Sequence, residues 1–164
     1  MTLERLWAGW RSEYVGSVGA EDDRNECLFC GLAASPDDEA LVVARGAGVF
    51  AVLNLYPYTS GHLMVAPVEH GADLEALTPD VAGALMEMTQ HAAAAIKAAY
   101  TPDGLNIGMN LGRAAGAGVP GHLHMHVVPR WAGDTNFMTT TAEVRVLPES
   151  LPVTLDRLRM AWQE

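Results

Sequence analysis

The chain has 164 residues, of which 49% are hydrophobic and 18% are charged. This composition excludes a disordered chain, and the length fits a single domain with a buried core over residues 1–164. The formal net charge of −10 argues against a nucleic-acid partner, although Arg113, Arg130, histidines and backbone N–H groups could still hold a small anion locally.

Residues 3–10 predict a short helix that presents Leu6, Trp7 and Trp10. This N-terminal segment lacks the apolar core and cleavage site of a secretion signal. The longest stretch without Asp, Glu, Lys or Arg, Gly46–Val68, is interrupted by asparagine, glycine and proline, so it predicts a pair of strands and not a membrane helix. We therefore expect a cytoplasmic protein with no membrane partner.

The two cysteines of the chain form the motif Cys27-Leu28-Phe29-Cys30. A single C-x-x-C motif is compatible with a redox pair, half of a zinc site, or two reduced thiols, and a structural disulfide is disfavoured in the cytoplasm. Zinc would need two further ligands, for which His70 and His122 are the candidates. The four residues would form a tetrahedral Cys2His2 site for a structural Zn²⁺ ion.

Two strands are predicted next in the chain. Val49–Leu53 is a continuous apolar run, as expected for a buried strand. Gly61–Ala66 alternates, which places Leu63 and Val65 on one face and His62 with Met64 on the other.

A long helix begins at Thr78-Pro79-Asp80, where a capping hydroxyl precedes a proline and an acid in the first turn. Its apolar stripe consists of Val81, Leu85, Met88, Ala92 and Ile96. The turn-forming residues 101–104 end it. A final helix is predicted from about Ser150 to Trp162, with Leu151, Leu155, Leu158 and Trp162 on one side.

Leu105–Leu111 alternates apolar residues with Asn106, Gly108 and Asn110, and a glycine-rich loop from Gly112 to Gly121 follows. Part of this loop matches the pattern G-x-G-x-x-G. A dinucleotide site would need a helix after the glycines, and a P-loop would need a Lys-Ser/Thr pair. Neither is present, so no organic cofactor is predicted. Backbone N–H groups of such a loop can still approach an oxyanion.

The most informative segment is His122-Leu123-His124-Met125-His126. A period of two is the geometry of a strand, so the three imidazoles share one face and the apolar residues share the other. A core packed with three histidines would leave ring nitrogens without partners, which favours a binding site for phosphate or a metal ion. Antiparallel pairing with the preceding strand would bring Asn106 or Asn110 toward the histidines.

Residues 122–128 resemble the histidine-triad (HIT) signature, in which histidines alternate with apolar residues. Asn54, followed by Gly61-His62 and an apolar strand, resembles the upstream half of the same family pattern. With the cysteine pair, the resemblance covers about residues 25–138. The segments 54–58 and 133–138 resemble a bacterial branch associated with diadenosine tetraphosphate phosphorylase.

The resemblance implies an α+β, HIT-like fold with an antiparallel sheet of about five strands and helices packed on one side. It also implies a homodimer, to which the N-terminal segment and the helix over Val81–Ile96 could contribute. The activity it implies is nucleotidyl transfer through a covalent histidine intermediate.

Each site residue is carried over by its position in the motif. His124 matches the nucleophile, and His62 and His126 match residues that contact phosphate oxygens. His122 matches the first histidine of the triad, which holds zinc or orients the nucleophile.

Asn54 matches a ribose contact and Asn110 a contact to the phosphates or the leaving group. Many family members carry a serine or threonine shortly before the triad, where this chain has Ala117-Gly118-Val119. We therefore expect backbone N–H groups around Gly118 and Val119 to bind the substrate there.

The leading expectation is an enzyme that cleaves dinucleoside polyphosphates, either by hydrolysis or, as Thr135-Asn136-Phe137-Met138 favours, by phosphorolysis. A purine nucleoside phosphoramidase is the alternative within the family. A zinc-stabilised nucleotide-binding module without turnover is an alternative of another class. A hydrolase with the triad as catalytic zinc ligands is disfavoured, because two of the histidines already have other roles.

Overall fold

The computed structural model describes residues 27–134 and 149–162 of the chain. The predicted helix at residues 3–10 and the segment Thr135–Met138 lie outside these ranges. No helix within the two ranges combines the length and the apolar character that crossing a bilayer requires.

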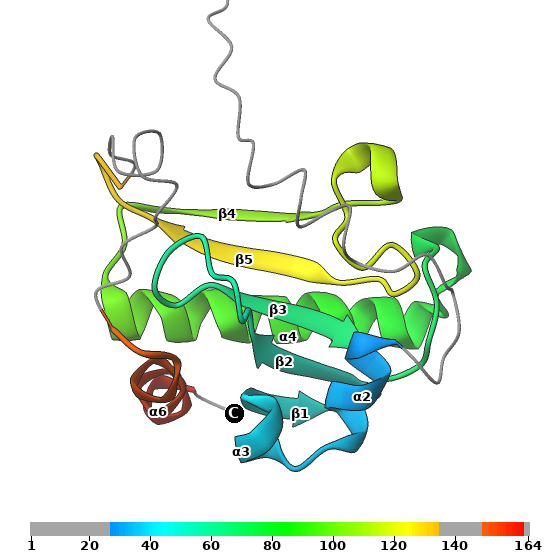
Figure 1. Cartoon of the computed structure of the whole chain (residues 1–164), viewed down its shortest axis with the longest axis horizontal. Helices are drawn as coiled ribbons and strands as arrows, with labels where there is room; N and C mark the ends of the chain where they lie inside the picture. The colour runs from blue at the N-terminus through cyan, green and yellow to red at the C-terminus, as the bar shows by residue number, and fades with distance from the viewer. Residues whose placement is uncertain (1–26, 135–148, 163–164) are drawn as a thin grey trace, which may run out of the picture.

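One sheet of five strands organises the molecule, in the order β1-β2-β3-β5-β4 (Figure 1). The strands are β1 Val42–Gly46, β2 Val49–Leu53, β3 Leu63–Pro67, β4 Gly104–Met109 and β5 Met125–Arg130. Every pair of neighbours is antiparallel. The predicted strand pair within Gly46–Val68 is β2 with β3, whose residues are all buried. The α+β class with a five-stranded antiparallel sheet is confirmed.

Helices α4 (Pro79–Tyr100) and α6 (Leu151–Ala161) cover one face of this sheet (Figure 1). The predicted N-cap of α4 is confirmed, since the Thr78 side chain accepts a hydrogen bond from the backbone N–H of Val81. The main core lies beneath these helices. It combines the apolar stripe of α4 with alternate residues of the sheet and of the segment that leads into β5: Val49, Ala51, Leu53, Leu63, Val65, Leu123, Met125 and Val127.

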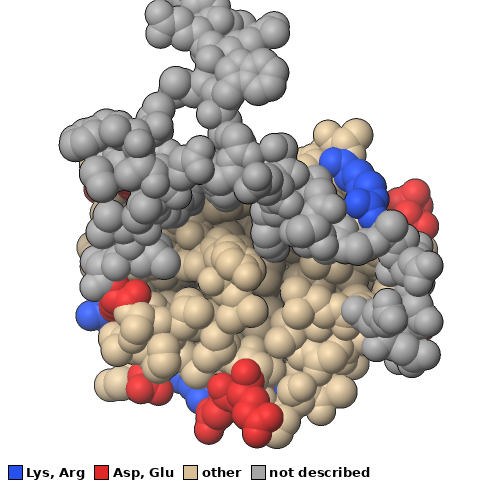
Figure 2. Space-filling model, in the orientation of Figure 1, with Lys and Arg blue, Asp and Glu red and all other residues tan. Residues whose placement is uncertain are grey.

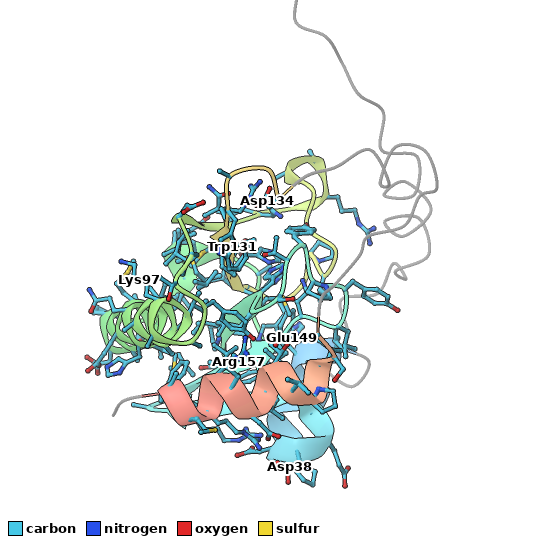
Figure 3. The ribbon with its side chains drawn as sticks, turned by 90° about the vertical axis from the view of Figure 1, so that its left-hand side faces the viewer. Asp38, Lys97, Trp131, Asp134, Glu149 and Arg157 are labelled. Atoms are coloured by element: carbon cyan, nitrogen blue, oxygen red, sulfur yellow. The ribbon has the colours of Figure 1, made fainter. Side chains whose placement is uncertain are left out.

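Hydrogen bonds and an ion pair around Glu149 connect α6 to the end of α4. Glu149 accepts hydrogen bonds from the hydroxyls of Tyr100 and Thr154, and Arg157 forms an ion pair with Glu149 at 3.3 Å. Figure 3 shows Glu149 and Arg157 close together above α6. Burial, followed by the bond to Glu149, raises the pKa of Tyr100 to about 12.

The opposite face of the sheet carries two short helices, α2 (Leu28–Ala34) and α3 (Asp37–Ala40). They close a smaller apolar cluster, formed by Phe29, Ala40, Val42, Phe50, Val52, Met64 and Ala66. The expected packing of helices on one side therefore describes α4 and α6, whereas α2 and α3 lie on the side of the histidines. On the part of this face that Figure 2 leaves visible, charged residues lie at the edges, around an uncharged depression.

The alternation predicted a strand that includes His122, but β5 begins only at Met125. His126 is in the strand, opposite Met64 of β3 and Gly108 of β4. The backbone N–H groups just before it bind loops instead of a strand: His122 donates to Val119 O and Leu123 donates to Gly71 O. The alternation of faces nevertheless extends through the whole segment.

Two single-turn 3-10 helices complete the described fold. The first, η1 (Leu74–Ala76), precedes α4, and the second, η2 (Arg113–Ala115), lies in the glycine-rich loop between β4 and β5. This loop returns the chain beside the histidines.

Candidate active site and metal-binding cluster

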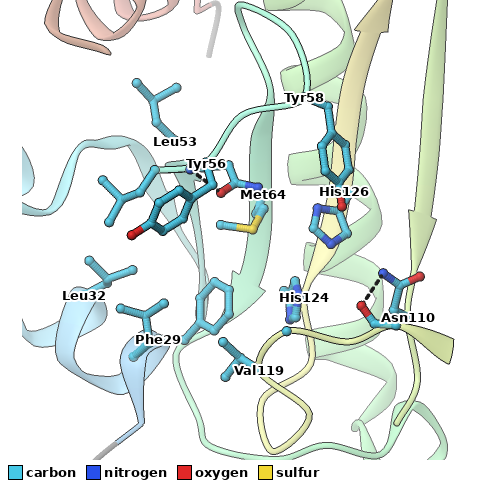
Figure 4. Close-up of a pocket in the computed structure, with 15 residues that line it drawn as sticks. Phe29, Leu32, Leu53, Tyr56, Tyr58, Met64, Asn110, Val119, His124 and His126 are labelled. Atoms are coloured by element: carbon cyan, nitrogen blue, oxygen red, sulfur yellow. Dashed lines mark hydrogen bonds between the residues drawn. The ribbon is translucent and has the colours of Figure 1, made fainter. Parts of the chain in front are cut away.

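A cavity of about 290 Å³ opens between α2, the β2–β3 connection and the glycine-rich loop (Figure 4). It is lined by Leu28, Phe29, Leu32, Leu53, Asn54, Leu55, Tyr56, Tyr58, Met64, Asn110, Gly116, Gly118, Val119, His124 and His126. Apolar side chains thus form one end of the cavity, and two of the three triad histidines form the other. This shape suits a ligand with an aromatic part and a polar part.

His124 is 5% exposed, and one of its ring nitrogens is held by a hydrogen bond. Nδ1–H donates to the backbone carbonyl of His122 at 2.8 Å, which leaves the lone pair on Nε2. Burial lowers the pKa of His124 below its ordinary value, and the bond to His122 offsets this only in part. A neutral imidazole with one free lone pair, held in a cavity wall, is a competent nucleophile.

His62 and His126, which is the next histidine after His124, are connected by a hydrogen bond between their rings. The backbone N–H of Tyr58 donates to Nδ1 of His62 at 3.1 Å, so the proton of a neutral His62 lies on Nε2. That Nε2 is 3.0 Å from Nδ1 of His126, to which it donates. His126 is then left with its own proton on Nε2. The backbone of Tyr58 thus makes His126 a hydrogen-bond donor, through His62.

The turn before His62 depends on Gly61, whose φ is +83°. A Cβ atom at this position would lie 2.9 Å from the ring of Tyr100, so both the backbone angle and the space require glycine. The hydroxyl of Thr59 donates to the carbonyl of Pro129 at 2.8 Å and ties the same turn to β5. These contacts hold His62 against His126.

The predicted substrate-binding residues also reach the cavity. Asn54 accepts a hydrogen bond from the Tyr56 N–H at 3.0 Å, and its amide nitrogen is 3.5 Å from the His62 ring. Asn110, Gly118 and Val119 also line the cavity. Of the two asparagines predicted near the histidines, Asn110 is there, while Asn106 accepts a hydrogen bond from Arg130 instead.

Neither Arg113 nor Arg130 lines the cavity. Arg130 lies on the surface, where both oxygens of Asp134 accept its hydrogen bonds at 2.5 and 2.8 Å. This bidentate pairing raises the pKa of Arg130 further above its already high value. The cavity-lining residues therefore carry imidazole N–H, amide N–H and tyrosine hydroxyl donors, and none of them is an arginine or a lysine.

Behind His124 lies a cluster of four potential metal ligands, Cys27, Cys30, His70 and His122, whose ligand atoms all lie within 4.8 Å of one another. Nδ1 of His122 is 3.3 Å from Cys27 Sγ and 3.7 Å from Cys30 Sγ, and His70 Nδ1 is 3.5 Å from Cys30 Sγ. In a tetrahedral zinc site with Zn–S of about 2.3 Å and Zn–N of about 2.0 Å, sulfur and nitrogen lie about 3.5 Å apart. The three sulfur–nitrogen distances in the cluster agree with that value.

The tautomer of His122 also suits a metal ligand. Nε2–H donates to the backbone carbonyl of Pro67 at 2.9 Å, so the Nδ1 lone pair points at the thiols. A carbonyl partner on the far ring nitrogen is the usual support of a ligating histidine. Burial, followed by the nearby His70 and His124, lowers the pKa of His122, while the bond to Pro67 opposes this change.

Two parts of the site were not predicted from the sequence. Phe29, between the two cysteines, stacks on the His124 ring, with centroids 4.7 Å apart and planes at 28°. Tyr58 packs on His62, with centroids 4.8 Å apart. The helical spacing of Leu28, Phe29 and Leu32 was the available signal for an apolar wall. Tyr58 lies in the segment 54–58 that resembles the bacterial branch, but no local pattern places its ring on His62.

Residues 36–133 match the HIT domain family. The chain belongs to the HIT family. This range includes His62, His70 and the whole histidine segment, while the two cysteines precede it.

Two relatives illustrate the similarity to other HIT proteins. The chain is 44% identical to the AP-4-A phosphorylase of Mycobacterium tuberculosis over 165 aligned residues, covering 98% of this chain and 85% of the relative. The crystal structure of a Zn-bound histidine triad family protein from Mycobacterium smegmatis has a TM-score of 0.68 at 30% identity, covering 85% of this chain and 94% of that one.

A histidine triad nucleotide-binding protein of Sulfolobus tokodaii, described as hypothetical, has a TM-score of 0.67 at 28% identity. It covers 82% of this chain and 91% of its own. The HIT fold expected from the histidine motif is therefore shared by bacterial and archaeal structures.

Proposed function

We propose that this chain is an enzyme that cleaves dinucleoside polyphosphates, such as diadenosine tetraphosphate, at the α-phosphate through a covalent nucleotidyl-histidine. The observation that carries the proposal is the fixed tautomer of His124 in the wall of the cavity. The 44% identity to an AP-4-A phosphorylase supports this class of substrate.

In the first step, the Nε2 lone pair of His124 attacks the α-phosphorus. The new P–N bond replaces the P–O bond to the rest of the polyphosphate, which leaves. His124 becomes positively charged, and the carbonyl of His122, which accepts its Nδ1–H, stabilises that charge. In the second step, an oxygen of water or of inorganic phosphate attacks the same phosphorus, the P–N bond breaks, and neutral His124 is restored.

His126 acts on the phosphate oxygens, whereas His62, which was expected to contact them too, is not among the cavity-lining residues and acts through His126. His126 donates its Nε2–H to the oxygens on which charge develops, because His62 occupies its Nδ1. Asn110 and the backbone around Gly118 and Val119 lie across the cavity and supply further N–H donors. Asn54 contacts the ribose, and the apolar end of the cavity takes the base.

We propose zinc as the ion of the cluster formed by Cys27, Cys30, His70 and His122. Two thiolates and two imidazoles are soft and intermediate ligands that suit zinc, and four protein ligands leave no open position for a substrate. When bound, the ion supplies structural cross-linking between α2 and the segments that carry the two histidines.

We also propose a cytoplasmic homodimer. Thiolate ligands persist in a reducing compartment, and the sulfur atoms of Cys27 and Cys30 lie 3.3 and 3.7 Å from Nδ1 of His122. Met86 on α4 and Ile107 on the edge strand β4 are 51% and 48% exposed, which leaves apolar surface on two elements. Sedimentation equilibrium of the full chain measures the mass, and a monomer at micromolar concentration would contradict the dimer.

A product assay tests the proposed activity. Diadenosine tetraphosphate is incubated with the enzyme with and without inorganic phosphate, and the nucleotides are separated by chromatography. ADP plus ATP formed only with phosphate identifies a phosphorylase, whereas AMP plus ATP without phosphate identifies a hydrolase. Absence of turnover in both conditions would contradict the proposal and favour a phosphoramidase or a binding module.

A further inference from the structure

The first turn of α2 belongs to two sites at once. Cys27 and Cys30 direct their sulfur atoms at the metal-binding cluster, within 3.7 Å of Nδ1 of His122. Phe29, between them, is 1% exposed and stacks on the ring of His124. The same three-residue spacing that brings the thiols together therefore places an aromatic ring against the proposed nucleophile (Figure 4).

Two contacts together define the orientation of the His124 ring. The hydrogen bond from Nδ1–H to the carbonyl of His122 fixes how the ring is turned within its own plane. The stack with Phe29, with planes at 28°, restricts tilting of the ring out of that plane. Neither contact alone would aim the Nε2 lone pair in a single direction.

Both contacts originate at the metal-binding cluster. His122 is a ligand whose own carbonyl receives the hydrogen bond, and Phe29 is covalently joined to Cys30. The Cys27 side chain makes no capping hydrogen bond for α2, and the helix has only seven residues. Hydrogen bonds from Arg45 to the carbonyls of Ala33 and Ser35 hold the far end of α2, whereas the ligand set and the packing of Phe29 hold its first turn.

We propose that Phe29 is a positioning residue. The metal-binding cluster fixes the position of Phe29, and Phe29 in turn restricts the orientation of the His124 ring. The proposal rests on the proposed function, in which His124 is the nucleophile. An error of about 1 Å in the position of a reacting group can lower a rate about 10²-fold. Loss of the stack should therefore slow the formation of the covalent intermediate more than it weakens substrate binding.

The test compares Phe29→Leu with Gly31→Ala, in the full chain loaded with its metal. Gly31 lies on α2 outside the set of residues that line the cavity, and a Cβ atom there would meet nothing within 4 Å, so it is the matched control for a change in the same helix. We expect Phe29→Leu to lower the single-turnover rate of nucleotidyl transfer about 10²-fold with little change in KM. Gly31→Ala should leave both the rate and KM unchanged. An unchanged rate for Phe29→Leu, with or without a rise in KM, would overturn the proposal.

A second readout does not depend on activity. In histidine-labelled protein, the ring current of Phe29 shifts the carbon-bound protons of His124 upfield in carbon–proton spectra. We expect chelation of the metal to reduce this shift in the wild type, and Phe29→Leu to abolish it while the protein still unfolds cooperatively. An unchanged shift after chelation would overturn the link to the cluster.

A third experiment combines the Phe29→Leu substitution with chelation of the metal. If Phe29 transmits the effect of the cluster to His124, chelation should slow nucleotidyl transfer by a smaller factor in Phe29→Leu than in the wild type, because only the contact through His122 is left to be lost. Effects that multiply would show two independent contributions and overturn the proposal. The failure of the proposed function can be told apart from the failure of this inference. If the wild type forms no covalent intermediate but shows the ring-current shift, the proposed function is contradicted, while the contact between Phe29 and His124 is still demonstrated.

Discussion

His122 and His126 lie four residues apart at the two ends of one histidine segment, yet their surroundings differ completely. His122 donates Nε2–H to a backbone carbonyl and turns its Nδ1 lone pair to two thiols. His126 accepts at Nδ1 from His62 and keeps a proton on Nε2 at the cavity. The tautomer, which the backbone sets at each position, suits one ring to ligate a metal and the other to donate a hydrogen bond to an anion.

His124 lies between these two regions and contacts residues of both. The metal-binding end supplies the carbonyl of His122 and the ring of Phe29, and the His62 end supplies the neighbouring His126, whose ring centroid is 5.0 Å away. Changes at the two ends should therefore have different signatures. Those at the metal-binding end should affect stability and geometry, and those at the other end should affect the reaction.

The largest effect is expected at the centre. His124→Ala removes the only ring nitrogen that the proposed reaction bonds to phosphorus, so turnover should be undetectable while nucleotide binding and the thermal midpoint remain near wild type. Turnover by chromatography and binding by calorimetry check this. His91→Ala, on α4 outside the cavity-lining set, is the control and should retain full activity. Turnover by His124→Ala would exclude His124 as the nucleophile.

A large but incomplete loss is expected at the His62 end. His126→Ala removes one preorganised donor to the phosphate, which should lower kcat by about 10²–10³-fold. His126→Gln keeps an amide N–H at a similar distance from the backbone and should recover part of that loss. Steady-state kinetics measure both variants. Equal activity of the wild type and His126→Ala would show that this end of the segment does not take part in the reaction.

At the metal-binding end, the main effect should be on stability. Cys30→Ser breaks the ligand set that ties α2 to His70 and His122. For a domain of this size, each 1 kcal/mol shifts the thermal midpoint by about 2–4 °C, so a loss of about 3 kcal/mol lowers it by roughly 10 °C. Calorimetry measures the midpoint, and metal analysis measures the bound ion. A chelator should destabilise the wild type but add nothing to Cys30→Ser, and an additive effect would contradict a shared site.

The smallest effect is expected from pH. The pKa of His124 is lowered from the ordinary 6.5 because burial penalises its charged form. The unfolded chain therefore takes up the proton first as the pH falls, so the folded state loses stability below pH 6.5 and is unaffected by this group above it. The nucleophile also stays neutral, and the acid limb of kcat/KM should lie below pH 6.5. An acid limb above that value would contradict the buried, neutral His124.

Much of this architecture was predictable because it depends on local patterns. Thr78 and Pro79 mark the start of α4 through local capping chemistry, and Val49–Leu53 marks β2 through continuous apolar character. The alternation of histidines and apolar residues assigns the two faces correctly, even before the strand begins. His70 completes the ligand set predicted with the cysteines, and Asn110 reaches the cavity as predicted.

The remaining features depend on contacts between segments far apart in the chain. The start of β5 at Met125 is set by backbone bonds to Val119 and Gly71, which no local pattern reveals. Arg130 resembles a cationic substrate contact in the sequence, but Asp134 and Asn106 bind it on the surface. The stack of Phe29 on His124 joins residues 95 positions apart in the sequence, and the helical placement of Phe29 becomes evident only once α2 is docked.

The most direct test of the central claim is to capture the covalent intermediate. The enzyme is mixed with diadenosine tetraphosphate, quenched within milliseconds under alkaline conditions that preserve phosphoramidates, and digested for peptide mass spectrometry. The account predicts one adenylyl group on the peptide that contains His124, formed fast enough to support turnover and absent in His124→Ala. Turnover without such a modification, or a modification on another residue, would contradict it.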